Sequence, residues 1–331
     1  MKIVADQAIP FLQGVLEPWA EVVYAAGESI TPALVRDADA LIVRTRTRCD
    51  ARLLAGSRVQ FIATATIGCD HLDTAWCDAH GIAWATAIGC NARGVLQWVA
   101  AALAWLARRE GWQPAQKTLG VVGVGHVGSL VAEYAAAWGF RVLCCDPPRE
   151  AREHLGFLPL DEVARQADLL TLHTPLDATT RHLIDARLLG LLPPGTTLLN
   201  AARGEVVDTA ALLASGRACL LDVWEHEPMP DRTLLRRALL ATPHIAGYSR
   251  QGKANATALA VAALARHFGL PLAGWYPAGV APSRPAPIGW EELLRTIDGA
   301  FAIEAESERL KAAPEAFESL RNRYRYREEY F

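Results

Sequence analysis

The chain lacks the features of a membrane-spanning, secreted or nucleic-acid-binding protein. No apolar run reaches the roughly 20 residues that a membrane span needs, and the N-terminus does not have the layout of a signal peptide. With 33 basic and 36 acidic residues the net charge is −3, so no overall attraction to nucleic acid or to an anionic membrane is expected. No repeat of solenoid period is present. These absences predict a cytoplasmic protein with neither nucleic acid nor membrane as a partner.

The sequence also lacks the cysteine and histidine spacings of a metal site. Its seven cysteines are scattered, with no CxxC pair. An odd number of cysteines in a chain expected to be cytoplasmic indicates free, mostly buried thiols. We therefore expect no disulfide framework and no bound metal.

What is present is an alternation of strand-like and helix-like segments along a chain of 331 residues, 51% of them hydrophobic. This length and composition can supply two domains with separate cores, and the alternation predicts parallel α/β sheets. Strands are expected at 2–5, 22–25, 40–44, 59–64, 82–85, 118–122, 140–145, 169–173, 197–200, 219–223 and 241–245. Long helices are expected at 91–109, 129–138 and 253–268.

The most informative motif is a glycine-rich turn between a predicted strand and a predicted helix. Gly123 permits the tight bend, Gly125 lets the backbone approach a pyrophosphate, and Gly128 lets the helix pack closely on the strand. The first N–H groups of the helix would face the pyrophosphate with the positive end of the helix dipole. This arrangement predicts a dinucleotide site.

An acidic residue at the end of the next strand specifies the dinucleotide. Asp146 stands eighteen residues after Gly128, where a carboxylate can accept both ribose hydroxyls and repel a 2′-phosphate. The sequence therefore favours NAD over NADP. Arg149, three residues further on, could weaken that exclusion.

Polar residues occur in three later segments, 200–208, 221–228 and 242–248, at the sheet edge where ligands of open α/β folds bind. Arg203 follows strand 197–200, and its planar fork can hold a carboxylate; the alternative is a surface arginine paired with Glu205 or Asp208. His244 lies near the end of the predicted strand 241–245, and a histidine beside a carboxylate is a general acid or base. Taken alone, such a histidine is more often structural.

The glycine-rich turn, Arg203, the Glu227-Pro228 pair and His244 occur in the same order, and at similar separations, as in the D-isomer-specific 2-hydroxyacid dehydrogenase family. The resemblance extends nearly to Phe268. It implies that His244 takes the C2 hydroxyl proton while a hydride passes from C2 to the nicotinamide. Glu227 would orient His244, and Arg203 would hold the C1 carboxylate and polarise the developing carbonyl. Formate dehydrogenases of this superfamily have Gln at the position of Glu227, so that branch is disfavoured.

Shorter motifs narrow the resemblance to a branch that oxidises 4-phospho-D-erythronate in the synthesis of pyridoxal phosphate. They lie at 43–47, 64–71, 88–92, 221–225 and 244–249. Substrate contacts are implied at Thr45, Thr66 and Tyr248. Contacts with NAD are implied at the turn residues Gly123, Gly125, His126, Val127 and Gly128 and at Asp146, Thr174, Asp222 and Gly247.

The resemblance also implies a domain organisation. We expect a flavodoxin-like substrate-binding domain from residues 1–93 and 253–281 and a Rossmann NAD-binding domain from residues 94–252. Residues 282–331 would form a small C-terminal α/β dimerisation domain, so a homodimer is expected. Prolines are dense between 270 and 287, which indicates a linker or an extended arm.

The substrate phosphate requires further cations. Arg44, Arg46 and Arg48 alternate with period two and would share one side of an extended segment. We favour Arg44, beside Thr45, as an anion contact, and expect Arg46 and Arg48 to lie on a solvated face. Arg327 could reach the active site of a partner subunit, although simple surface exposure is the better expectation.

Two rival functions stay open. A phosphoglycerate or hydroxypyruvate-type dehydrogenase would use the same Arg, Glu and His. An NAD-sensing corepressor or scaffold could retain these residues while acting through partner binding, because a fold does not determine a function.

Overall fold

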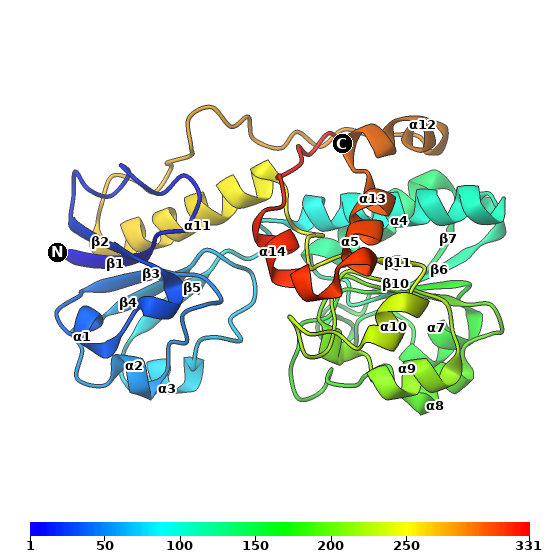
Figure 1. The fold of residues 1–331 in the computed structure, drawn as a ribbon, viewed down its shortest axis with the longest axis horizontal. Coiled ribbons are helices and arrows are strands. Elements are labelled where there is room, and N and C mark those ends of the chain that lie inside the picture. The colour runs from blue at the N-terminus through cyan, green and yellow to red at the C-terminus, as the bar shows by residue number, and fades with distance from the viewer. The chain divides into compact units, whose positions relative to one another are not determined.

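The structure is a computed structural model that describes residues 1–331. The chain divides into two compact units, one made of residues 1–91 and 250–282 and the other of residues 92–249 and 283–331. Each unit is built on one parallel sheet (Figure 1). No helix combines the length and the apolar character that crossing a membrane requires. Two parallel-sheet units confirm the α/β class that the alternation of segments predicted.

The first unit has a five-stranded sheet in the order β2-β1-β3-β4-β5, the order of flavodoxin-like folds. Its strands are β1 (Lys2–Asp6), β2 (Glu21–Ala25), β3 (Ala40–Val43), β4 (Phe61–Thr64) and β5 (Ala83–Thr86). Its helices are α1 (Pro32–Val35), α2 (Ala51–Leu54), α3 (Thr74–Ala79) and α11 (Arg250–Phe268). Figure 1 shows α11 along one face of this sheet and α1 to α3 on the other.

Alternate residues of these strands enter two different cores. Val4, Leu41 and Ile62 pack with residues of α1, α2 and α3, whereas Ile3 and Ile42 pack with apolar residues of α11. Successive side chains of a strand point to opposite faces, so a sheet covered by helices on both sides needs apolar residues at every position. This requirement explains the continuous apolar runs of the strands.

The second unit has a six-stranded parallel sheet in the order β11-β10-β9-β8-β6-β7. Its strands are β6 (Thr118–Val122), β7 (Arg141–Cys145), β8 (Leu169–Leu172), β9 (Thr197–Asn200), β10 (Cys219–Leu221) and β11 (Leu240–Ala241). The strand order reverses between β6 and β8, which places the topological switch point at the glycine-rich turn after β6. Ligands of open α/β sheets bind outside the carboxyl ends of the strands at such a point.

Helices cover both faces of this second sheet. On one face lie α4 (Ala92–Glu110) and α5 (His126–Trp138), whose apolar residues pack with Leu119 and Val121. Apolar residues of the shorter helices pack with Leu170 and Leu172 on the other face. These shorter helices are α7 (Leu160–Gln166), α8 (Ala186–Leu191), α9 (Thr209–Ser215) and α10 (Arg232–Arg237). The helix α6 (Pro147–Glu153) follows β7 and has no buried residue.

The C-terminal segment consists of helices where a small α/β unit was expected. Its helices are α12 (Trp290–Ala300), α13 (Ile303–Ala312) and α14 (Phe317–Asn322). Apolar residues such as Trp290, Leu293 and Ile297 recur every three or four residues and bury one helix face. Of these helices, α12 packs against α4 and α13 against β11. The segment therefore covers the sheet of its own unit.

Two boundaries differ from the sequence prediction. The strand expected at 241–245 ends at Ala241, because Pro243 has no N–H to donate and the N–H groups of Ile245 and Ala246 bind a carboxylate instead. The helix expected to start at Ser129 starts at His126, directly after Gly125. This earlier start brings three more N–H groups to the glycine-rich turn.

Replacement of Phe331 by alanine tests how firmly the C-terminal segment is held. The Phe331 side chain is 2% exposed and contacts Tyr134 and Trp138. Phe331→Ala should lower the free energy of unfolding by about 3 kcal/mol, the usual effect of deleting a buried phenyl ring. Urea unfolding followed by tryptophan fluorescence measures this. Leu155→Ala, at a side chain that is 59% exposed, should change the free energy of unfolding little. Equal losses of stability in both variants would contradict the buried position of Phe331.

Candidate active site

The glycine-rich turn after β6 leaves space at one of its three glycines and none at the other two. A Cβ on Gly128 would lie 1.9 Å from the carbonyl oxygen of Gly123, and a Cβ on Gly123 would lie 2.8 Å from the backbone of His173. Gly123 also has a φ of 85°, a conformation that favours glycine. Around Gly125, by contrast, no atom lies within 4 Å of an added Cβ. Gly125 therefore provides the surface that a pyrophosphate can approach.

Two further observations fit this surface to a dinucleotide. Gly125 is the N-cap of α5 without a side-chain cap, so the first N–H groups of His126, Val127 and Gly128 point beyond the helix. The hydroxyl of Thr174 is buried and has no hydrogen-bond partner within the protein. Its backbone nitrogen lies 2.9 Å from the Cβ position of Gly123. A bound dinucleotide would supply the partners that these groups lack.

Asp146 joins the strand β7 to the glycine-rich turn. One carboxylate oxygen accepts the N–H of Val124 at 2.8 Å, and the other accepts the N–H of Arg149 at 3.0 Å. Because a carboxylate oxygen has two lone pairs, Asp146 retains acceptor capacity for ribose hydroxyls. The contact with Val124 also holds the glycine-rich turn beside the carboxyl end of β7.

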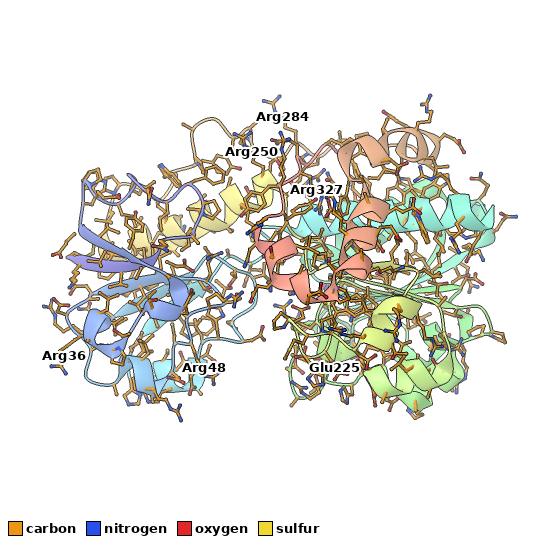
Figure 2. All side chains as sticks on the ribbon, viewed as in Figure 1. Arg36, Arg48, Glu225, Arg250, Arg284 and Arg327 are labelled. Carbon is orange, nitrogen blue, oxygen red and sulfur yellow. The ribbon has the colours of Figure 1, made fainter.

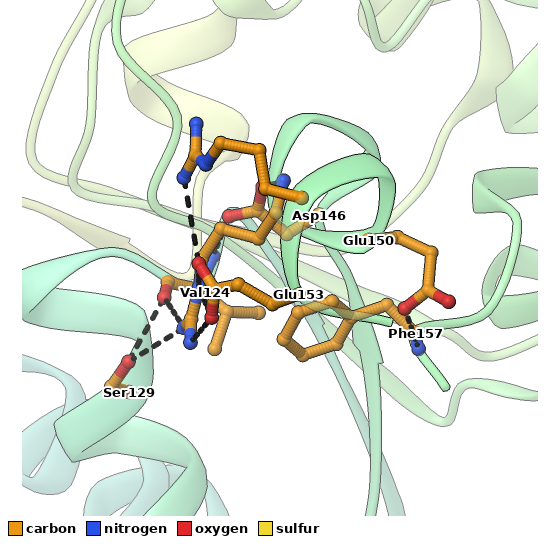
Figure 3. Close-up of polar contacts among 8 residues, drawn as sticks. Val124, Ser129, Asp146, Glu150, Glu153 and Phe157 are labelled. Atoms are coloured by element: carbon orange, nitrogen blue, oxygen red, sulfur yellow. Dashed lines mark hydrogen bonds and ion pairs between the residues drawn. The ribbon is translucent and has the colours of Figure 1, made fainter. Parts of the chain in front are cut away.

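Arg149, which could have favoured a 2′-phosphate, is held by other groups, among them Glu153 and Val124, which are labelled in Figure 3. Its guanidinium donates to the carboxylate of Glu153 and to the carbonyl of Val124, and it stacks over the ring of Phe157. The hydrogen bond to Glu153 raises the pKa of Arg149 above its ordinary value. The neighbouring positive charge is therefore already paired, and the preference for NAD that Asp146 predicts is preserved.

Asp222, at the end of β10, organises the loop that carries His244. Its side chain is 1% exposed, and its oxygens accept the hydroxyl of Thr242 at 2.6 Å and the N–H groups of Ile245 and Ala246 at 2.8 and 2.9 Å. Its carbonyl oxygen accepts the N–H of His244 at 2.7 Å. Burial raises the pKa of Asp222, and the charge of His244 and these donors oppose the rise. This organising role within the loop was not foreseen from the sequence.

His244 and Glu227, the residues predicted as an acid–base pair, lie within hydrogen-bond distance of each other. His244 Nδ1 lies 2.7 Å from Glu227 Oε2, while Glu227 Oε1 accepts the N–H of Trp224 at 3.0 Å. Burial raises the pKa of Glu227. The charge of His244 and its hydrogen bond outweigh this effect, so the pKa of Glu227 lies below its usual value. An ionised Glu227 accepts a hydrogen bond from Nδ1–H of His244. In a neutral ring Nε2 then carries the lone pair that can accept a proton.

Arg203 lies in the loop that follows β9, next to the loop that follows β10. The side-chain amide of Asn200 donates to the carbonyl of Arg203 at 2.9 Å and accepts the N–H of Ala202 at 3.0 Å, which shapes the turn. A Cβ on Gly204 would lie 2.0 Å from the carbonyl carbon of Trp224. Glycine is therefore required where these two loops touch.

In the first unit, the expected anion contact Arg44 is already bound to a carboxylate. Its Nε lies 2.9 Å from Asp6 Oδ2 and its Nη2 lies 3.3 Å from Asp6 Oδ1, and Asp6 is fully buried. Sequence reasoning missed Asp6, although its place at the end of β1 was a usable signal. Thr66 bonds to the hydroxyl of Thr64 at 2.6 Å and donates to Gly68, whereas Thr45 is exposed.

Surface exposure was the better expectation for Arg327, and it is wrong; contact with a partner's active site stays a prediction. Arg327 is 6% exposed, and it donates to the carbonyls of Gly94, Ile245, Ala246 and Tyr248. Its guanidinium also stacks 4.2 Å from the ring centroid of Phe301. In Figure 2 it contrasts with Arg48, which extends outward and is 72% exposed, as expected.

Comparison with known proteins identifies the family. The model of the D-isomer specific 2-hydroxyacid dehydrogenase, NAD binding domain, matches residues 90–246. The erythronate-4-phosphate dehydrogenase of Bacteroides fragilis is 44% identical over 345 aligned positions, which cover 99% of this chain and 97% of the relative. The protein of the same name from Ectopseudomonas mendocina is 48% identical, over 82% of this chain and 73% of the relative.

The chain belongs to the erythronate-4-phosphate dehydrogenase family. Solved structures of the wider group agree in fold. The NAD⁺-bound 3-phosphoglycerate dehydrogenase of Entamoeba histolytica superposes with a TM-score of 0.70 at 25% identity, over 81% of this chain and 95% of that one. A D-lactate dehydrogenase of Aquifex aeolicus in complex with NAD and lactic acid gives 0.66 at 25% identity, over 85% and 100%.

Membership of this family favours the dehydrogenase hypothesis among those that the sequence left open. It makes the chain an NAD-dependent dehydrogenase. In such an enzyme the glycine-rich turn, Asp146 and the unsatisfied hydroxyl of Thr174 are the groups that fit NAD. Direct contacts of Asp222 and Gly247 with NAD remain predictions.

Gly125→Ala and Gly128→Ala should separate cofactor binding from folding. At Gly125 the new methyl group meets no protein atom, so the melting temperature should stay unchanged. The Kd for NAD should rise about tenfold or more, which corresponds to a loss of about 1.4 kcal/mol of binding free energy. At Gly128 it would overlap a backbone oxygen, so both melting temperature and NAD affinity should fall. Differential scanning fluorimetry and titration calorimetry measure the two effects. Unchanged NAD affinity in Gly125→Ala would exclude this surface as the pyrophosphate site.

Proposed function

We propose that the protein oxidises 4-phospho-D-erythronate at C2 to 2-oxo-3-hydroxy-4-phosphobutanoate, a step in the biosynthesis of pyridoxal 5′-phosphate. The observation that carries the proposal is the 2.7 Å contact between His244 and Glu227, in a chain that aligns with erythronate-4-phosphate dehydrogenases over nearly its whole length. Arg203, Glu227 and His244 follow β9, β10 and β11, which are adjacent parallel strands. Their loops therefore leave the sheet at the same edge.

Each of the three residues has a distinct part in the oxidation. Neutral His244 takes the proton of the C2 hydroxyl at Nε2, because Nδ1 is occupied by Glu227. Glu227 fixes the ring orientation and stabilises the imidazolium that forms. Arg203 holds the C1 carboxylate and polarises the carbonyl that develops at C2. NAD, when bound, accepts the hydride from C2.

We propose that Thr45, Thr66 and Tyr248 bind substrate hydroxyl or phosphate oxygens. Arg44 contacts an anion only with the part of its fork that Asp6 leaves available. Its net contribution to phosphate binding is therefore smaller than that of an unpaired arginine, since Asp6 neutralises its charge.

We also propose that the protein acts in the cytoplasm as a homodimer. Support for the location comes from its relatives, which are bacterial metabolic enzymes. The C-terminal helices pack on their own unit, so a dimer would use their outer surfaces. Sedimentation velocity at several concentrations tests this proposal, and a monomer at every concentration would exclude it.

The decisive test is oxidation of 4-phospho-D-erythronate by the purified protein with NAD. A 2-oxo acid is added as a second acceptor so that tightly held NADH can be reoxidised, and the oxidised product is measured directly. His244→Ala should lower kcat by about 10²- to 10⁴-fold, the usual contribution of a general base. His80→Ala removes an exposed histidine of the other unit and serves as the matched control.

Each alternative has its own outcome in the same experiment. Turnover of 3-phosphoglycerate without turnover of 4-phospho-D-erythronate would make the protein a phosphoglycerate dehydrogenase. Binding of NAD without turnover of either acid would favour the NAD-sensing corepressor or scaffold. Equal loss of activity in His80→Ala and His244→Ala would contradict the assigned base.

A further inference from the structure

The C-terminal segment places an arginine, Arg321, beside the His244–Glu227 pair. Arg321, on α14, has Nη1 at 3.8 Å from Glu227 Oε2, the oxygen that binds His244. Its Nε donates to the hydroxyl oxygen of Tyr248 at 3.1 Å, and its guanidinium carbon lies 5.9 Å from the centre of that ring. One guanidinium therefore touches both the carboxylate of the pair and a proposed substrate contact.

The chain is anchored on both sides of Arg321. Phe317, one turn earlier, is 1% exposed and packs in the core of the second unit with Leu310. Arg327, six residues later, is bound to the carbonyls of the loop that carries His244. Arg321 itself is 22% exposed at its side chain. Its position beside Glu227 is thus set by buried contacts rather than by a surface ion pair alone.

Several charged and titratable groups interact with this pair. Asp222 acts on His244 from the end of β10, and it also acts on Arg321. Tyr248 faces Arg321 from the His244 loop, and Tyr324, from the chain after α14, lies within 6.4 Å of the Tyr248 ring, centre to centre. Arg327 donates to the hydroxyl of Tyr324. Arg321 places positive charge 3.8 Å from the Glu227 oxygen that is bonded to His244.

The expected effect follows from the sign of the charges. Glu227 attracts a proton to His244, and a cation beside Glu227 weakens that attraction. The charge of Arg321 contributes to the lowered pKa of Glu227, after the larger contribution of His244. Without the cation, Glu227 would hold His244 in its charged form up to a higher pH. Oxidation of an alcohol requires the neutral ring, so the cation favours the base.

We propose that Arg321 is a positioning residue that keeps His244 neutral in the oxidation direction and turns the hydroxyl proton of Tyr248 away from itself, toward a substrate oxygen. A donor bound to the Tyr248 oxygen leaves that hydroxyl able to act as a donor. This inference rests on the proposed oxidation of a 2-hydroxy acid by His244. It assigns to the C-terminal segment a direct role in the chemistry of its own subunit.

The test compares Arg321→Gln, Arg321→Lys and the control Arg323→Gln, which removes an exposed charge two residues away. The pH profile of kcat/KM for oxidation is measured for each full-length protein. In Arg321→Gln the acid limb should move to higher pH by about one unit, so that activity on that limb falls about tenfold. Arg321→Lys keeps the charge and should restore the limb, while its KM stays raised because the fork to Tyr248 is lost.

A second measurement does not depend on the substrate. NMR titration of the His244 ring, assigned with His244→Asn, should show the same shift in Arg321→Gln and no shift in Arg323→Gln. If the shift is seen without turnover of any acid, the proposed function fails while the inference about the pair holds. A titration midpoint that is the same in wild type and Arg321→Gln would overturn the inference. A shift in Arg321→Lys as large as in Arg321→Gln would overturn the role of charge.

Discussion

The buried carboxylate of Asp222 is the constraint on which the geometry of this active site depends. It accepts hydrogen bonds from the hydroxyl of Thr242 and from the backbone N–H groups of Ile245 and Ala246, and these two N–H groups cannot then extend β11 along its neighbour. The strand ends at Ala241, and His244 takes a left-handed conformation with a φ of 57°. Breaking this arrangement would leave a charge and several donors unsatisfied in the interior, which is far more costly than the gain from any one of these bonds. His244, the proposed base, is thus held in place by an interaction between the end of β10 and the loop that follows β11.

The backbone carbonyls of the His244 loop are bound by the C-terminal segment. The N–H groups of Ile245 and Ala246 bind Asp222, whereas their carbonyls accept from Arg327. A loop buried in this way must place every backbone donor and acceptor, and here one anion and one cation from distant parts of the chain do so. The segment after residue 283 is therefore part of the active-site framework. Its helices bury their apolar faces on α4 and β11 and hold Arg321 and Arg327 in place.

Paired charges recur at the groups assigned to chemistry. Arg44 is held by Asp6, Arg149 by Glu153, and His244 by Glu227 with Arg321 behind it. Pairing lowers the field that each cation offers to a ligand, but it also fixes the cation before the ligand arrives. Fixed dipoles and charges need little reorganisation during a reaction, which is how preorganised sites stabilise developing charge. Arg149 and His244 are thus positioned by charged partners before any ligand binds.

The sequence by itself determined the parallel α/β sheets, the glycine-rich turn, Asp146 and the order Arg203, Glu227, His244. These are local features: each depends on side-chain alternation, on a glycine at a φ that others avoid, or on a residue that directly follows a strand. Only the tertiary structure decided that β11 stops at Ala241, that Arg44 is bound to Asp6, and that Arg321 and Arg327 contact the His244 loop. The contacts of these arginines with Asp6 and with the His244 loop join residues 38 to 82 positions apart in the chain, and no periodicity encodes which distant partner satisfies a buried charge. That choice is made when the elements pack, because only then are the groups desolvated and required to pair.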